Sequence, residues 1–149
     1  MLNQTQCHDD LRYVFRSFPL TCLYHLRANS HRLIRGAYID QHGNGCIMYL
    51  LSESLPVSRR IFSKQSLLAH FSHDNNDEAP EYQPAKWIVR LWDASDSPQI
   101  QARYGPNAKL EAEDVLNVLV EMIEEREGTE VQPLNAVEDS TRQMIAAGV

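Results

Sequence analysis

A histidine and a cysteine, two residue types that cooperate in nucleophilic catalysis, lie four residues apart in the segment DQHGNGC, residues 40–46. In such a pair His42 would take the proton of the Cys46 thiol, and backbone amides of the glycines would stabilise an oxyanion. The spacing matches no catalytic motif and offers no identifiable third group. A turn followed by a buried cysteine explains the same residues, because cysteine is among the most frequently buried residue types. We expect a turn here, and an enzyme that uses Cys46 and His42 is the alternative.

A second set of residues has the types that bind metal ions. His70 and His73 stand three residues apart near the end of a predicted helix, and Asp74 follows. Two imidazoles and a carboxylate suit zinc or iron. The sequence has no HExxH or CxxC signature, and histidine is in any case favoured near a helix C-terminus by the helix dipole. We expect no metal or other cofactor, and a metal enzyme at His70, His73 and Asp74 remains an alternative.

Arginines concentrated in the first half of the chain have the chemistry to bind phosphate, because the guanidinium group presents forked hydrogen-bond donors. They are Arg27, Arg32, Arg35, Arg59 and Arg60. The isoelectric point is near 5.4, whereas a dedicated nucleic-acid binder is usually basic, and no signature of a nucleic-acid-binding domain is present. We expect these arginines to pair with the acidic C-terminal helix, and nucleic-acid binding is the second alternative.

Two further features indicate an interaction surface. Trp87 and Trp92 lie about 140° apart around a helix, so one is expected in the core while the other reaches a partner. Glu124, Glu125 and Glu127 end a predicted helix, where negative charge opposes the dipole, and a basic surface nearby would offset that cost. The predicted partner-binding residues are Trp87, Trp92, Glu124, Glu125, Glu127, Arg32, Arg35, Arg59 and Arg60.

Composition sets the class of protein. The 149 residues are 43% hydrophobic, which suits one compact domain spanning residues 1–149. The longest apolar runs are too short to cross a membrane, and the polar N-terminus does not resemble a signal peptide. Three cysteines at unrelated spacings are typical of reduced thiols, so we expect a cytoplasmic protein without membrane contact.

Charge is distributed unevenly along the chain. Residues 1–66 carry a net charge of +4, and residues 67–149 carry −10. Such asymmetry either marks a charged partner or is neutralised when the two halves pack together. We expect the second arrangement.

The elements that must position these residues have mostly helical patterns. A short helix ending at Ser17 is expected, capped by Asp9 or Asp10. Residues 20–35 carry both a strand-like and a helical alternation of apolar residues, and the helical one lasts longer. We therefore expect a helix over residues 20–35, with a strand pair as the alternative.

The glycine-rich segment itself has β-forming residues on both sides. Gly43, Asn44 and Gly45 tolerate positive φ, so the sequence predicts a β-hairpin near residues 37–50. The alternative is a helix that begins near Cys46, because the residues after it also fit a helical face.

Further along the chain, the pattern predicts helices over residues 64–72, 84–92 and 111–127, with an irregular connection over residues 93–109. Gly128 is expected to end the helix over 111–127. Residues 128–149 are then a C-terminal extension with a weak helix that either frays or docks on a partner.

Together these features predict a mainly α-helical single domain of five or six helices with one small β-hairpin. No recognisable catalytic set is present. We expect a protein–protein interaction or self-associating module without catalytic activity.

Overall fold

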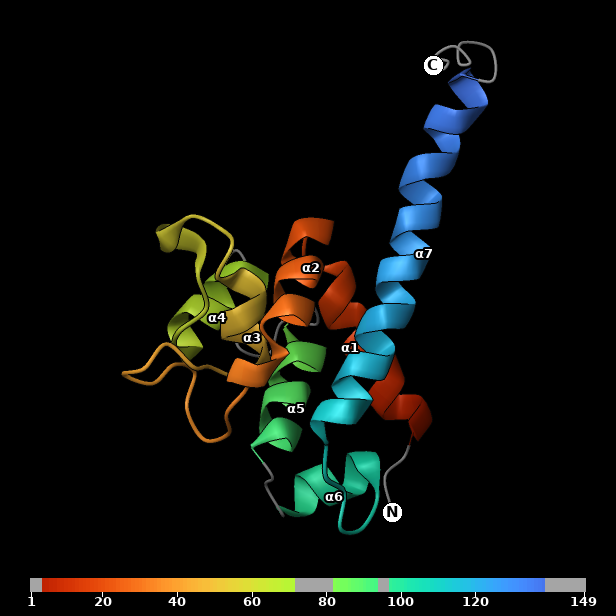
Figure 1. Cartoon of the computed structure of the whole chain (residues 1–149). Helices are drawn as coiled ribbons and strands as arrows, with labels where there is room; N and C mark the ends of the chain where they lie inside the picture. The colour runs from red at the N-terminus through yellow and green to blue at the C-terminus, as the bar shows by residue number, and fades with distance from the viewer. Residues whose placement is uncertain (1–3, 72–81, 94–96, 139–149) are drawn as a thin grey trace.

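The computed structural model describes residues 4–71, 82–93 and 97–138, with side chains from residue 5 to residue 128. Within these ranges the chain forms seven α-helices and two short 3-10 turns (Figure 1). They are α1 (Gln4–Arg16), α2 (Leu20–Ala28), η1 (Ser30–Arg32), α3 (Ile47–Ser52), η2 (Val57–Arg59), α4 (Lys64–Phe71), α5 (Gln83–Trp92), α6 (Pro98–Tyr104) and α7 (Ala112–Glu138). The prediction of a mainly α-helical chain is confirmed.

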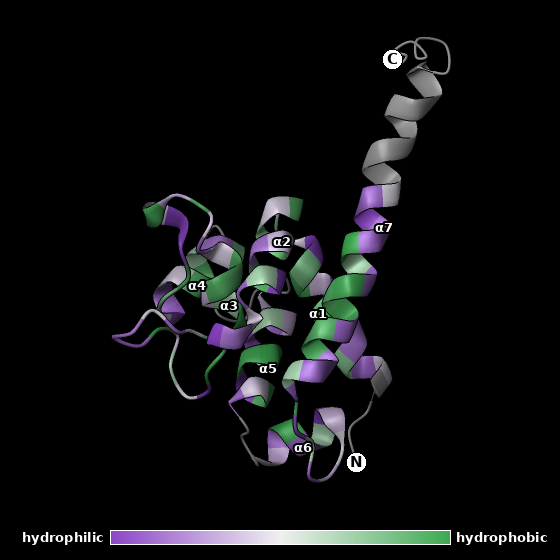
Figure 2. Cartoon of the chain, viewed as in Figure 1, coloured by the Kyte–Doolittle hydropathy of each residue, from purple (hydrophilic) through white to green (hydrophobic). Residues whose placement is uncertain are grey.

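The core lies where α1 and α2 meet α3, α5 and α7. Helix α1 packs against α5 and α7, and α2 packs against α3 and α7. The buried apolar side chains form one cluster, which includes Leu11, Phe15, Ile88 and Leu119. Figure 2 shows apolar residues along the part of α7 that lies beside α1. Beyond that part, α7 continues away from the rest of the molecule (Figure 1).

Local sequence explains where several helices begin. The hydroxyl oxygen of Ser97 accepts a hydrogen bond from the backbone amide of Ile100 at 3.3 Å, and Pro98 occupies the first turn of α6. Helix α7 begins with the reverse bond, since the carboxylate of Asp114 in its first turn accepts from the backbone amide of Glu111 before the helix at 3.0 Å. Helix α6 lies inside the stretch that was expected to be irregular, and its Ser-Pro start was the signal for it.

The predicted β-hairpin is wrong. The described residues contain no strand, and this segment makes only two isolated bridges, from Leu33 and from Ile39 to Gly45. The chain enters helix α3 directly after Cys46, as the alternative proposed. All six residues of α3 are buried, and a helix satisfies its own backbone hydrogen bonds there, whereas a hairpin would need a partner strand.

Three other helix boundaries differ from expectation. Helix α1 already includes Gln4, so Asp9 and Asp10 lie inside it and do not cap its start. Helix α2 ends at Ala28 because Asn29 leaves the helical region with φ −116°, and the chain continues through η1 into extended backbone at Leu33. Helix α7 does not end at Gly128 but continues to Glu138. The remainder of the predicted C-terminal extension, residues 139–149, lies outside the described residues.

No helix in the described ranges combines the length and the apolar character that crossing a bilayer requires.

The backbone of Gly45 lies close to its neighbours, and Gly45→Ala is expected to destabilise the fold. A Cβ atom at this position would lie 2.7 Å from the backbone oxygen of Tyr38 and 2.5 Å from a ring carbon of Tyr49. Overpacking of this kind costs about 1–3 kcal/mol, measurable by urea unfolding. Gly128→Ala is the control, since a Cβ there meets nothing within 4 Å and alanine favours the helix. Equal stability of the two variants would contradict this packing.

Candidate functional site

The glycine-rich segment folds into a loop around Asp40. The Asp40 carboxylate accepts hydrogen bonds from the backbone amides of His42 and Asn44 at 2.8 and 2.9 Å, and from the Asn44 side chain at 3.2 Å. Such bonds are typical of an Asx turn. These bonds lower the pKa of Asp40, although partial burial opposes them.

The structure does not bring His42 and Cys46 together. His42 is exposed at the tip of the loop, whereas Cys46 is 3% exposed and its backbone amide donates to the Tyr38 carbonyl. Burial raises the pKa of the Cys46 thiol to about 11, and the helix α3 amides oppose this only in part. A nucleophilic cysteine needs a lowered pKa, so neither geometry nor electrostatics favours catalysis by this pair.

Native cysteine alkylation is therefore expected to be slow. Burial raises the pKa of Cys7 to about 12, and Cys22 is buried as well. At pH 8 we expect Cys7 and Cys46 to react with iodoacetamide more than about 100-fold more slowly than a free thiol. Mass spectrometry after native and denatured labelling measures this difference. Rapid modification of Cys46 in the native protein would contradict its burial and would favour the alternative of an enzyme that uses Cys46 and His42.

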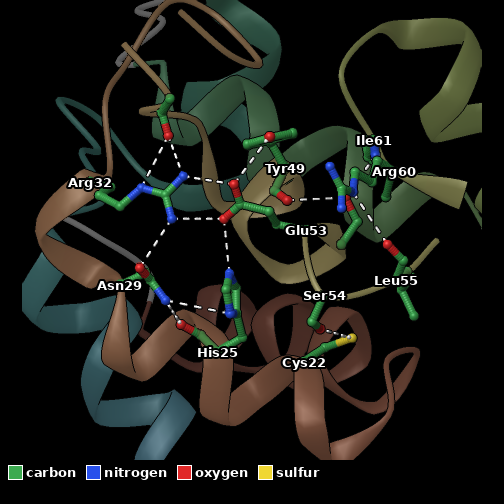
Figure 3. A network of polar contacts seen from close by, with 12 residues as sticks. Cys22, His25, Asn29, Arg32, Tyr49, Glu53, Ser54, Leu55, Arg60 and Ile61 are labelled. Atoms are coloured by element: carbon green, nitrogen blue, oxygen red, sulfur yellow. Dashed lines mark hydrogen bonds and ion pairs between the residues drawn. The ribbon is translucent and has the colours of Figure 1, made fainter. Parts of the chain in front are cut away.

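The densest polar network in this region surrounds Glu53 (Figure 3). We call it the Glu53 cluster, and it consists of His25, Asn29, Arg32, Tyr49 and Glu53. Arg32 donates to both carboxylate oxygens of Glu53, at 2.8 and 2.7 Å. His25 lies 2.8 Å and the Tyr49 hydroxyl 3.2 Å from the same carboxylate. Arg32 also donates to Asn29 at 3.0 Å.

The cluster holds three parts of the chain together. His25 belongs to α2, Glu53 follows α3, and Nε of Arg32 donates to the Gly43 carbonyl of the loop at 3.0 Å. The bonds from Arg32 lower the pKa of Glu53 to about 2, against an opposing effect of burial. Arg32 was expected to pair with the acidic C-terminal helix, and that expectation is wrong. The Arg32 guanidinium instead holds the loop around Asp40 against α2 and α3 through its bonds to Gly43 and Glu53.

The side chains of Arg35 and Trp92 likewise form their interactions with other residues of the same chain. Arg35 donates to the backbone oxygens of Trp92 and Leu110, the latter at 2.7 Å, and its guanidinium lies 4.0 Å from the centre of the Trp92 ring. The indole N–H of Trp92 donates to the Ile34 carbonyl at 2.6 Å. Arg35 also lies 3.7 Å from Glu111. Trp92 is thus a core residue.

Trp87 has an intermediate position. It is half-buried, and the guanidinium groups of Arg90 and Arg103 each lie 5.4 Å from its ring centre. Of the two tryptophans, only Trp87 therefore presents part of its surface to solvent.

The predicted acidic helix end lies inside α7, because the helix continues to Glu138, and two of its three glutamates contact α1 or α2. Glu124, Glu125 and Glu127 are exposed. Glu125 lies 3.8 Å from Arg16, and Glu127 accepts a hydrogen bond from the Tyr24 hydroxyl at 2.5 Å.

One turn earlier on α7, Arg12 of α1 binds Glu121 at 2.8 Å. Within the described residues, Arg12 and Arg16 therefore make the ion pairs between the first half of the chain and α7. Sequence reasoning had not singled out these two arginines, although their spacing of four residues places them on one face of α1.

The residues predicted to bind metal are only partly described. His70 stacks on the ring of Phe18, with centroids 4.5 Å apart and an interplanar angle of 15°. His73 and Asp74 lie outside the described residues. Elsewhere in the described chain, no group of three potential metal ligands comes together. The metal site therefore stays a prediction.

A buried ionic group was missed by sequence reasoning. Asp10 is 3% exposed and receives hydrogen bonds from Arg103, at 2.8 Å to each oxygen, and from the Tyr104 hydroxyl at 2.5 Å. Asp10 lies on the same helical face as Cys7, Leu11 and Val14, and an acidic residue on an apolar stripe was the available signal. Gln6, one turn earlier, also donates to Asp10 at 3.0 Å, whereas Arg103 and Tyr104 stand more than 90 positions later and carry no corresponding signal.

Comparison of the chain with protein-family models, curated proteins and solved structures finds no match. A proposal of function therefore depends on the contacts described above.

Proposed function

We propose that this protein is a non-catalytic interaction module that self-associates through the outer part of α7. The observation that carries this proposal is the extent of α7, which has 27 residues and a length of about 40 Å. Its core side chains lie between Val115 and Ile123. The outer part is defined here as residues 128–138, which follow the hydrogen bond between Glu127 and Tyr24 of α2 and continue away from the rest of the molecule (Figure 1).

The outer part of α7 gains little stability from its own sequence. Short isolated helices are marginal in water. Gly128 has a low helix propensity, and Pro133 cannot donate the hydrogen bond that an interior helical residue makes. The segment also contains the apolar residues Val131, Leu134 and Val137. A second copy of the chain supplies a surface against which such a helix packs, and closed dimers are the commonest oligomers.

The charge distribution supports a contact between an acidic region of one copy and a basic region of the other. Glu124 is exposed at the base of the outer part and has no hydrogen bond or ion pair within the described residues. Arg59 is exposed on η2 and has no carboxylate partner in the described chain. Contacts between acidic and basic regions of this kind weaken as salt is added. The three cysteines are free thiols, which supports a reducing, cytoplasmic location.

Truncation after Gly128 is expected to convert an oligomer into a monomer. Ile123 is the last core residue among the described side chains of α7, so the truncated chain should unfold within a few degrees of the full chain. Sedimentation velocity at low and high salt measures the mass of both chains. A full chain that is monomeric at both salt concentrations would contradict self-association.

A further inference from the structure

A pocket of about 420 Å³ lies where the end of α1, the turn η2 and helix α4 meet. We call it the arginine pocket, and its lining residues are Ser17, Ser58, Arg59, Arg60, Ser66, Ala69 and His70. None of them belongs to the Glu53 cluster or to α7. Its volume falls in the range typical of small-molecule sites.

The two arginines give this pocket a positive charge that the described residues do not neutralise. Neither Arg59 nor Arg60 has a carboxylate within ion-pair distance there, and Nε of Arg60 donates only to the Leu55 carbonyl, at 3.2 Å. Other arginines do have carboxylates within 4.0 Å, namely Arg12, Arg16, Arg32, Arg35 and Arg103. The charge pattern of the pocket therefore leaves both guanidinium groups available for an anion.

The remaining polar groups of the pocket are neutral. The His70 ring is fixed by stacking on Phe18 and by an edge contact with Phe71 at 4.8 Å. Burial lowers the pKa of His70, a hydrogen bond from the ring to the Ser17 backbone carbonyl partly opposes this, and the nearby charge of Arg59 lowers the pKa further, so the ring is neutral near pH 7. Ser58 is exposed.

The other two serines shape the wall of the pocket. The hydroxyl of Ser17 donates to the Tyr13 carbonyl at 2.9 Å, and that of Ser66 donates to the Ser63 carbonyl at 3.0 Å. Their protons are already used inside the chain. Ser58 is therefore the neutral donor left to contact an anion, because the N–H of the neutral His70 ring is directed to the Ser17 backbone carbonyl.

We propose that the arginine pocket binds a phosphate monoester of a small organic molecule. Arg59 and Arg60 contact the phosphate oxygens, since forked guanidinium donors match that geometry, and Ser58 supplies a neutral hydrogen bond. The pocket has more room than a phosphate group fills, so the organic part of the ligand lies inside it as well. Next to the lining residues in sequence, Val57 is 68% exposed and Phe62 is 51% exposed, which adds apolar surface for that part.

Calorimetric titration of the full chain at constant ionic strength tests this assignment. The probes are glycerol 3-phosphate, inorganic phosphate, glycerol and a single-stranded oligonucleotide. We expect saturable binding of glycerol 3-phosphate, weaker binding of inorganic phosphate, and none of glycerol. Arg59→Gln should weaken glycerol 3-phosphate binding at least tenfold with an unchanged melting temperature, because the Arg59 side chain holds no internal hydrogen bond in the described structure.

Arg27→Gln is the matched control, since Arg27 is also exposed but lies on α2 against Tyr24, outside the pocket. Its affinity for glycerol 3-phosphate should equal that of the unchanged chain. Absence of saturable binding, equal losses in the two variants, or equal affinity for inorganic phosphate would each overturn the proposal. Oligonucleotide binding that is tighter and depends on Arg59 would overturn it in favour of a nucleic-acid surface.

Discussion

Replacing Asp10 by alanine is expected to destabilise the protein by about 3–5 kcal/mol, because it removes one partner of a buried ion pair. The Asp10 carboxylate is 4% exposed and accepts two hydrogen bonds from Arg103. Without it, a guanidinium that is only 28% exposed loses its counter-charge. The hydroxyl of Tyr104, which is fully buried, also loses its acceptor. A domain of this size has a total stability of about 5–15 kcal/mol, so the loss would be a large fraction of it.

Urea unfolding followed by tryptophan fluorescence measures this loss, and the neighbouring residue provides the control. The Asp9 side chain is 61% exposed, and its one polar partner in the described part of the chain is Arg12, at 3.2 Å. Asp9→Ala should therefore change the free energy of unfolding by less than about 1 kcal/mol. Similar losses in the two variants would show that the Asp10 pair does not hold α1 against α6.

The second large effect is a loss of stability in acid that depends on Glu53. The pKa of Glu53 is about 2 in the folded chain, against 4.5 for an ordinary glutamate, chiefly because Arg32 donates to its carboxylate. A lowered pKa contributes stability that is fully present above pH 4.5 and is lost as the pH falls towards 2. Because the side chain is 19% exposed, the contribution is at most about 3 kcal/mol.

Glu53→Gln tests this effect because it removes the titrating group. Above pH 5 the variant should be less stable than the unchanged chain, and the difference should shrink as the pH falls from 5 to 3. Glu124→Gln is the control, since Glu124 is exposed on α7 and belongs to no described ion pair. The free energy of unfolding at each pH is the quantity to measure. A constant difference between Glu53→Gln and the unchanged chain would exclude Glu53 as the source of the pH dependence.

Local patterns predicted the helices whose apolar stripes are regular. The predicted helices over residues 64–72 and 84–92 correspond to α4 and α5 within one residue at either end. In these segments the helical period, the first-turn residues and the burial agree, so local preference and tertiary packing favour the same structure.

Prediction failed where tertiary context decided between two local preferences. The segment IMYLLS, residues 47–52, contains β-forming residues, yet it is buried throughout and forms α3. A fully buried short segment has no polar face, so its periodicity does not distinguish a strand from a helix. Gly128 was similarly read as a helix end, although glycine also occurs inside helices at a modest cost in stability.

The polar sites were the hardest features to predict. The Glu53 cluster joins residues from α2, the loop and α3, and the Asp10 group joins α1 to α6. Such contacts depend on how helices pack, and no spacing in the sequence encodes them. Arg59 and Arg60 were recognised as candidate anion-binding residues from their type alone, whereas the contribution of Ser58 and His70 to the same pocket depends on the fold.

Spin labelling at Gly128 tests most directly whether α7 mediates self-association. The native thiols are buried, so a label on Gly128→Cys reports that position, where a side chain meets nothing within 4 Å. Gln99→Cys, an exposed position on α6 at the opposite end of the molecule, is the control (Figure 1). We predict dipolar coupling between chains for the label at residue 128 and much weaker coupling at residue 99. Absence of coupling at residue 128 in a concentrated solution would contradict self-association through α7.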